Sequence, residues 1–189
     1  HKMNAVVISA LTLALVTFVD SNSYDENKPR CVQDIIKYCE KESMDKIAQL
    51  ISSLDYPELG YRDTCTMFLG SQLAFYSFVP QGAPDPFFKN NKLREKTIKN
   101  SIVKGKPEVD DDTEVTSING YNFSIEYKHI YPGVNGNPIR FEQEVPLDSG
   151  YSTLYIVNGL IGISQDDVLE NLGSPESGEY MSPDDYQNC

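Results

Sequence analysis

The four cysteines are the feature that most limits how this chain can fold. They are Cys31, Cys39, Cys65 and Cys189, an even set without a Cys-x-x-Cys pair. The chain has 2 histidines, too few for a typical zinc site. Two disulfides are therefore expected, and disulfides persist in oxidising compartments such as the extracellular space.

The spacing of the first two cysteines restricts how they pair. Apolar residues recur three and four positions apart from residue 32 to 39, as on one face of a helix. On that helix Cys31 and Cys39 lie about 12 Å apart, too far to bond. Each is expected to pair with Cys65 or Cys189. We favour Cys31 with Cys65 and Cys39 with Cys189; the alternative is that Cys189 is free or joins two chains.

The first residues are typical of a signal peptide, which predicts a secreted, extracellular protein. An uncharged run over 5–19 is followed by a polar stretch over 20–23, and His1 and Lys2 precede the methionine. The run is shorter than the roughly 20 residues that span a bilayer. A leader over 1–23 is the favoured interpretation, with no transmembrane segment after its removal, and a membrane anchor is the weaker alternative.

Charge and composition limit the partners and the number of domains. A formal net charge of -12 opposes binding to nucleic acid. The 40% hydrophobic content is enough for one core, so one domain is expected over 24–172. Residues 24–30 are expected to be a short exposed segment before the first helix of this domain. The stretch 173–189 is rich in acids, serine and proline and is expected to be a flexible tail.

Periodicity predicts alternating helices and strands across this domain. A second helix is expected over 44–54, capped by Ser43. Turn residues Gly70-Ser71 and Asn119-Gly120 punctuate the pattern. The other expected elements are a strand over 64–69, a helix over 72–78, a loop over 81–91, a helix over 93–102, a hairpin over 115–127, strands over 139–145 and 154–157, and a closing helix over 166–172.

Four segments in this order resemble the fasciclin domain, over residues 31–172. They are Thr66 to Phe75 (TMFLGSQLAF), Leu93 to Gly105 (LREKTIKNSIVKG), Val115 to Gly120 (VTSING) and Leu154 to Ile161 (LYIVNGLI). The resemblance implies an α+β fold: a fasciclin-like wedge of two small β-sheets with several helices packed around one side. Asn100-Ser101 stands where some members carry a tyrosine-histidine pair linked to integrin binding.

The same resemblance implies a function without catalysis. Fasciclin domains mediate extracellular adhesion or matrix interaction through their surfaces, so the expected partner is an extracellular protein, a glycan or a cell surface. The alternative is a soluble carrier of a small hydrophobic ligand, a lipid or a pigment. No cofactor is implied.

The residues themselves favour the absence of an active site or a metal site. His129 is the one histidine outside the leader, next to a Pro-Gly turn, and no nucleophile elbow, zinc helix or phosphate loop is present. Five clustered carboxylates suit calcium but lack the spacing of a calcium loop, so a solvated loop is favoured. They are Glu108, Asp110, Asp111, Asp112 and Glu114.

Two candidate surfaces and one modification motif remain. Lys89, Lys92, Lys96 and Lys99 fall on one face of the expected helix and would meet an acidic partner; the alternative is a solvated face attracted to the protein's own acids. Replacing Lys92, Lys96 and Lys99 with glutamate is expected to leave folding intact. Asn122-Phe123-Ser124 is an N-glycosylation motif. An apolar ligand patch or core packing is expected for the concentrated aromatics: Phe75, Tyr76, Phe78, Phe87 and Phe88.

Overall fold

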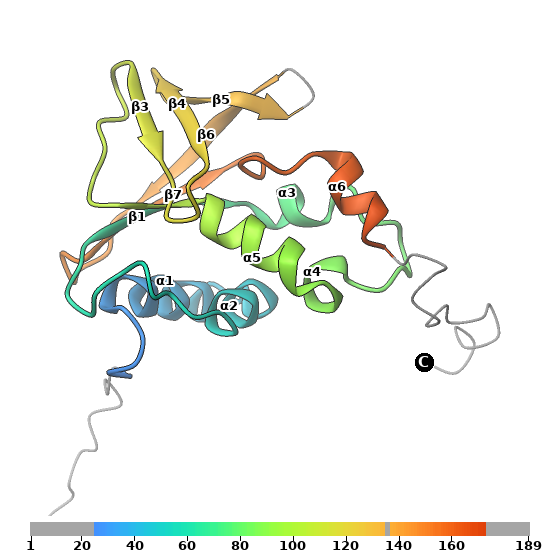
Figure 1. Ribbon diagram of the computed structural model, residues 1–189, viewed down its shortest axis with the longest axis horizontal. Helices are drawn as coiled ribbons and strands as arrows, with labels where there is room; N and C mark the ends of the chain where they lie inside the picture. Colours follow the sequence, from blue (N-terminus) through green and yellow to red (C-terminus); the bar gives the residue numbers. More distant parts are fainter. Residues whose placement is uncertain (1–24, 135–136, 173–189) are drawn as a thin grey trace, which may run out of the picture.

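A computed structural model describes residues 25–134 and 137–172 of the chain (Figure 1). Its seven strands form one sheet in the order β2-β1-β7-β6-β5-β4-β3. Pairing is antiparallel throughout except between β1 and β7, which are parallel. The strands are β1 (Cys65–Gly70), β2 (Ile102–Lys104), β3 (Thr113–Thr116), β4 (Asn122–Glu126), β5 (His129–Val134), β6 (Asn137–Val145) and β7 (Ser152–Val157).

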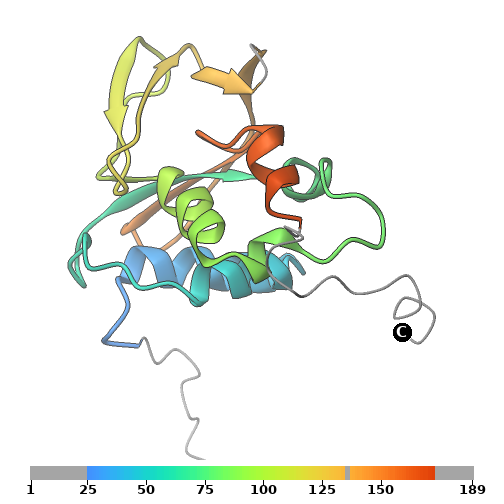
Figure 2. The ribbon, with the colours of Figure 1, turned by 45° about the vertical axis from the view of Figure 1, so that its right-hand side comes forward.

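Six short helices accompany the sheet in the described residues. They are α1 (Arg30–Lys41), α2 (Asp45–Ser52), α3 (Gln72–Tyr76), α4 (Pro86–Lys89), α5 (Asn91–Asn100) and α6 (Gln165–Glu170). Figures 1 and 2 show α1, α2 and α5 beside β1 and β7, with β3, β4 and β5 on the other side of these two strands. Within the described ranges, no helix has the length and apolar character needed to cross a membrane.

The expected pair of small sheets with helices around one side is wrong. The strand β6 is long enough to join both halves, because its first residues pair with β5 and its last residues pair with β7. A register shift between Phe141 and Gln143 interrupts this strand where the partner changes. The two ends of the strand order also approach each other, since the Ile118 N–H donates to the Ile102 carbonyl at 2.8 Å. The result is one nearly closed, barrel-like sheet.

Strand β1 is buried on both faces and its neighbour β7 is largely buried, so these two strands divide the interior into two cores. Side chains alternate across a strand, and Met67 and Leu69 of β1 pack toward the helices. Phe68 between them points into the curl of the sheet. There it stacks on Tyr155 with ring centroids 5.6 Å apart and meets Phe123 and Phe141 edge-on.

The segment before α1 is attached to the domain, although Asp25, Glu26 and Asn27 are exposed. The Gln33 side chain accepts from the Asp25 N–H and donates to the carbonyls of Asp25 and Lys28, all within 2.7 Å. The Lys28 ammonium donates to the carbonyls of Ser52 and Leu54 at the end of α2. A cation there complements the negative end of a helix, so this segment holds α1 and α2 together.

One of the two favoured disulfides is present. Cys31 at the start of α1 is bonded to Cys65 at the start of β1, with their Cα atoms 5.8 Å apart. This confirms the Cys31–Cys65 pairing. Cys39 is a buried free thiol in the described residues, and burial raises its pKa to about 12. Cys189 lies outside the described residues, so the Cys39–Cys189 pairing stays a prediction.

Local sequence signals placed most elements correctly, with three differences. The hairpin turns at Asn119-Gly120, where Gly120 has a φ of 76°, as expected. Ser43 is not the cap of α2, because Met44 precedes that helix and Ser43 itself has a φ of 58°. A single turn of helix, α4, interrupts the expected loop over 81–91, and β5 was not predicted.

The tight turn between β4 and β5 yields a stability prediction. Both its residues have positive φ, 47° at Tyr127 and 63° at Lys128, a conformation that suits Asn and Gly far better. Lys128→Gly is expected to raise the free energy of unfolding by about 1 kcal/mol, or the melting temperature by about 2–4 °C. The turn should keep its shape in the glycine variant, because the backbone of residue 128 is held on both sides. The N–H of Lys128 donates to the Val109 carbonyl, and the carbonyl of Lys128 accepts from the Phe141 N–H.

The control for this prediction is Lys128→Ala, measured by thermal unfolding. Alanine also removes the ion pair to Asp110, which is exposed and worth little, but it does not relieve the positive φ. Alanine should therefore leave stability unchanged or slightly lower. A glycine variant no more stable than the alanine variant would contradict strain at this turn.

Candidate functional site

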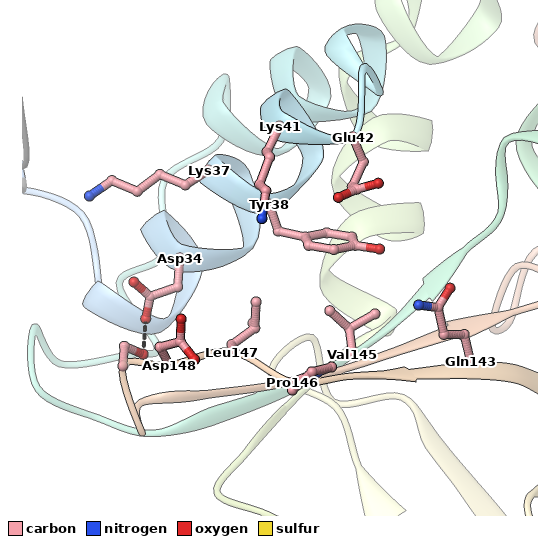
Figure 3. A pocket seen from close by; sticks show the side chains of 11 residues that line it. Asp34, Lys37, Tyr38, Lys41, Glu42, Gln143, Val145, Pro146, Leu147 and Asp148 are labelled. Atoms are coloured by element: carbon pink, nitrogen blue, oxygen red, sulfur yellow. Dashed lines mark hydrogen bonds between the residues drawn. The ribbon is translucent and has the colours of Figure 1, made fainter.

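An open groove of about 600 Å³ runs between α1 and the segment from the end of β6 into the β6–β7 connection (Figure 3). The helix supplies one wall and the β6–β7 segment supplies the other. The lining residues are Asp34, Lys37, Tyr38, Lys41, Glu42, Gln143, Val145, Pro146, Leu147, Asp148 and Ser149.

The helix wall follows from the periodicity of α1. Asp34, Lys37, Tyr38 and Lys41 are spaced i, i+3, i+4 and i+7, so they share one face. The neighbouring face of α1 carries the buried residues Cys31, Val32, Ile35 and Cys39. One helix therefore contributes both to the core and to the groove, and the disulfide at Cys31 fixes its first turn to the sheet.

A buried carboxylate attaches the second wall to the helix. Asp34 is 7% exposed and accepts hydrogen bonds from the hydroxyls of Ser149 and Ser152, the latter at 2.7 Å. The Ser149 hydroxyl also accepts from the Tyr151 N–H at 3.1 Å. A buried carboxylate needs such donors, and here they fix the β6–β7 connection at one end of the groove.

The aromatic ring of Tyr38 is the central apolar element of the groove. Figure 3 shows this ring projecting from α1 toward the β6 wall, above Val145 and near Glu42. Burial raises the pKa of Tyr38, and Glu42 adds to the shift. Its hydroxyl therefore stays protonated through the neutral and mildly alkaline range, where it can donate a hydrogen bond.

The groove combines an apolar floor with a charged rim of both signs. Val145, Pro146 and Leu147 provide apolar surface on the β6 side. Lys37, Lys41, Glu42 and Asp148 carry charges around it. Such a surface can bind a mixed polar and apolar partner, with tyrosine as an aromatic anchor.

The predicted lysine face is not one exposed surface. Lys89 and Lys92 are exposed, but Lys96 forms an ion pair with Asp167 at 3.2 Å. The Lys99 side chain is 5% exposed and its ammonium lies 2.9 Å from both Glu58 and Glu95. Burial alone would lower the pKa of Lys99, but the hydrogen bonds to these glutamates raise it. Lys99 is therefore a buried structural cation, which corrects its assignment to a partner surface.

The predicted aromatic patch is mostly core. Phe75 and Phe87 are buried with ring centroids 5.3 Å apart, and Tyr76 and Phe78 pack partly buried against the same core. Phe88 is 36% exposed. An apolar ligand patch made of these five residues is therefore wrong, and core packing explains four of them.

The remaining sequence candidates lie outside the groove. His129 is on β5 with its Nδ1 3.0 Å from the Tyr127 carbonyl oxygen. Within residues 25–134 and 137–172, no group of three or more acidic, histidine or cysteine side chains is arranged to hold a metal ion. The carboxylates of the 108–114 run are exposed, and Asp110 pairs with Lys128. Asn122 is exposed on β4.

Sequence reasoning missed the groove because its two walls are far apart in the chain. The helix wall left a signal, the polar and aromatic stripe from Asp34 to Lys41 beside the apolar one. The second wall depends on how the β6–β7 connection packs against α1, which no local pattern encodes.

No protein-family model matches the chain, and a search of curated proteins found no match. The resemblance to the fasciclin domain therefore stays a prediction from sequence.

Proposed function

We propose that this chain is a secreted, non-enzymatic binding protein that contacts an extracellular protein, a glycan or a cell surface through the α1–β6 groove. The observation that carries the proposal is the groove itself, an open surface with an aromatic residue at its centre and charges of both signs at its rim. Protein interfaces are built in this way, with aromatic anchors surrounded by polar groups.

Secretion is supported by the Cys31–Cys65 disulfide, because such bonds persist in oxidising compartments. The leader-like run over 5–19 and the charge of -12 agree with a soluble extracellular protein.

Truncation of the aromatic anchor tests the proposal. Tyr38→Ala is expected to weaken saturable binding to cells, collagen or heparin by about tenfold or more, because tyrosines at interface centres contribute strongly. Binding would be measured with labelled protein over a concentration series. Thermal unfolding of each variant separates lost binding from lost folding.

The matched control is Tyr127→Ala, which removes a tyrosine that is 68% exposed and lies outside the groove. A second pair, Lys41→Glu in the groove and Lys92→Glu on α5, makes the same charge change inside and outside it. If Tyr127→Ala or Lys92→Glu reduces binding while the groove variants do not, the contact surface lies elsewhere.

A soluble carrier of a small hydrophobic molecule is the second candidate. The volume of the groove lies within the range of small-molecule sites, and Tyr38, Val145 and Leu147 provide apolar lining. Against this, a small-molecule site usually encloses most of its ligand, whereas this groove is open. Organic extraction of natively purified protein followed by mass spectrometry would detect a carried lipid or pigment. The same molecule should be absent from an extract of the Tyr38→Ala variant.

A further inference from the structure

Strand β4 presents an asparagine with the chemistry and the exposure of a glycan acceptor. Asn122, Phe123 and Ser124 form the Asn-x-Ser pattern in which the central residue is not proline. Burial alternates along β4. Phe123 is 2% exposed and packs in the same core as Phe68, whereas Asn122 is exposed and Ser124 is partly exposed. The folded domain therefore leaves the acceptor amide in solvent.

The surroundings of Asn122 also leave room for a bulky group. The strand lies next to β3, the last strand in the sheet order, and Thr116 of β3 is its cross-strand partner. Thr116 is exposed as well, and its hydroxyl donates to the Asn122 Oδ1 at 2.7 Å. This bond uses the amide oxygen and leaves the amide nitrogen, where a sugar is attached.

We infer that Asn122 carries an N-linked glycan. This inference rests on the proposed secretion, because the modification is made in the same oxidising route that forms the disulfide. Neither Asn122 nor any residue of β3 or β4 lines the groove, so the glycan leaves the proposed contact site open.

To test this inference, the full chain would be expressed through the secretory pathway of a eukaryotic cell. The intact mass of the protein in the medium would then be measured. The expected result is a mass above that of the polypeptide by one oligosaccharide. A glycan-removing amidase should return it to the polypeptide mass with aspartate at position 122. Asn122→Gln and Ser124→Ala should abolish the added mass, and Ser124→Thr, which keeps the motif, should retain it.

Two other outcomes separate this inference from the proposed function. A secreted protein with the plain polypeptide mass overturns the glycan and leaves secretion standing. A chain that stays in the cytosol without a glycan overturns both. Asn91→Gln, which changes an exposed asparagine outside any such motif, should keep the added mass and controls for general effects of the substitution.

Discussion

Lys99→Glu is expected to lower the free energy of unfolding by about 3–5 kcal/mol at neutral pH, because it places an unpaired carboxylate at a buried position beside two other carboxylates. The Lys99 side chain is 5% exposed and contacts Glu58 and Glu95. In the variant, the new carboxylate at position 99 lies beside the carboxylates of these two glutamates. Denaturant unfolding would measure the loss. The deficit should shrink as pH falls into the carboxyl range, since like charges raise the pKa of the buried acid and its protonation removes the repulsion.

Two companion variants keep this prediction decisive even if Lys99→Glu does not fold. Lys99→Met removes the ion pairs without adding a like charge, and a loss of about 1 kcal/mol is expected because Glu58 and Glu95 remain partly solvated. Lys92→Glu makes the same reversal at an exposed position of the same helix and should change stability by less than about 0.5 kcal/mol. Equal effects at 92 and 99 would show that the burial of Lys99 is immaterial.

Removal of the disulfide is expected to lower stability by about 4 kcal/mol, the loop-closure value for cysteines 34 residues apart in sequence. The variant is Cys31→Ala with Cys65→Ala, compared with the unchanged protein by denaturant unfolding. The loss reflects the greater freedom of the unfolded chain, together with two truncated side chains in the core.

A reducing agent provides the control for this second prediction. In a Cys189→Ser background, which removes the predicted Cys39–Cys189 bond, reduction should destabilise the protein that keeps Cys31 and Cys65 and leave the double variant unchanged, because Cys39 is not bonded within the described residues. A double variant as stable as the unchanged protein would show that other contacts hold α1 on β1 without help from the bond.

How far the sequence predicted the structure depends on whether the signal was local. The apolar stripe of α1 and the Asn119-Gly120 hairpin were legible because neighbouring residues determine them. Strand β5 was missed because Pro132-Gly133 is typical of a turn, yet Ile130 is paired on both sides, with Ile125 and Ile139. Tertiary pairing overrode the local preference.

The candidate site shows the same limit more strongly. The lysine face was drawn from helical spacing alone, and Glu58, which neutralises Lys99, comes from another part of the chain. The concentration of aromatics was visible, but burial decided that Phe75 and Phe87 belong to the core. The groove needs Asp34 to hold the distant Ser152, which no window of sequence could reveal.

The parallel pairing of β1 with β7 has a consequence for how the protein folds while it is being synthesised. The first strand of the sheet lies between β2 and the last strand, so its second edge has no partner until almost the whole domain has left the ribosome. Contacts so distant along the chain form slowly, because a long loop must close before they are gained. During synthesis one edge of β1 and its apolar side chains therefore stay uncovered until β7 has emerged. A nascent chain would most need protection from aggregation in this interval.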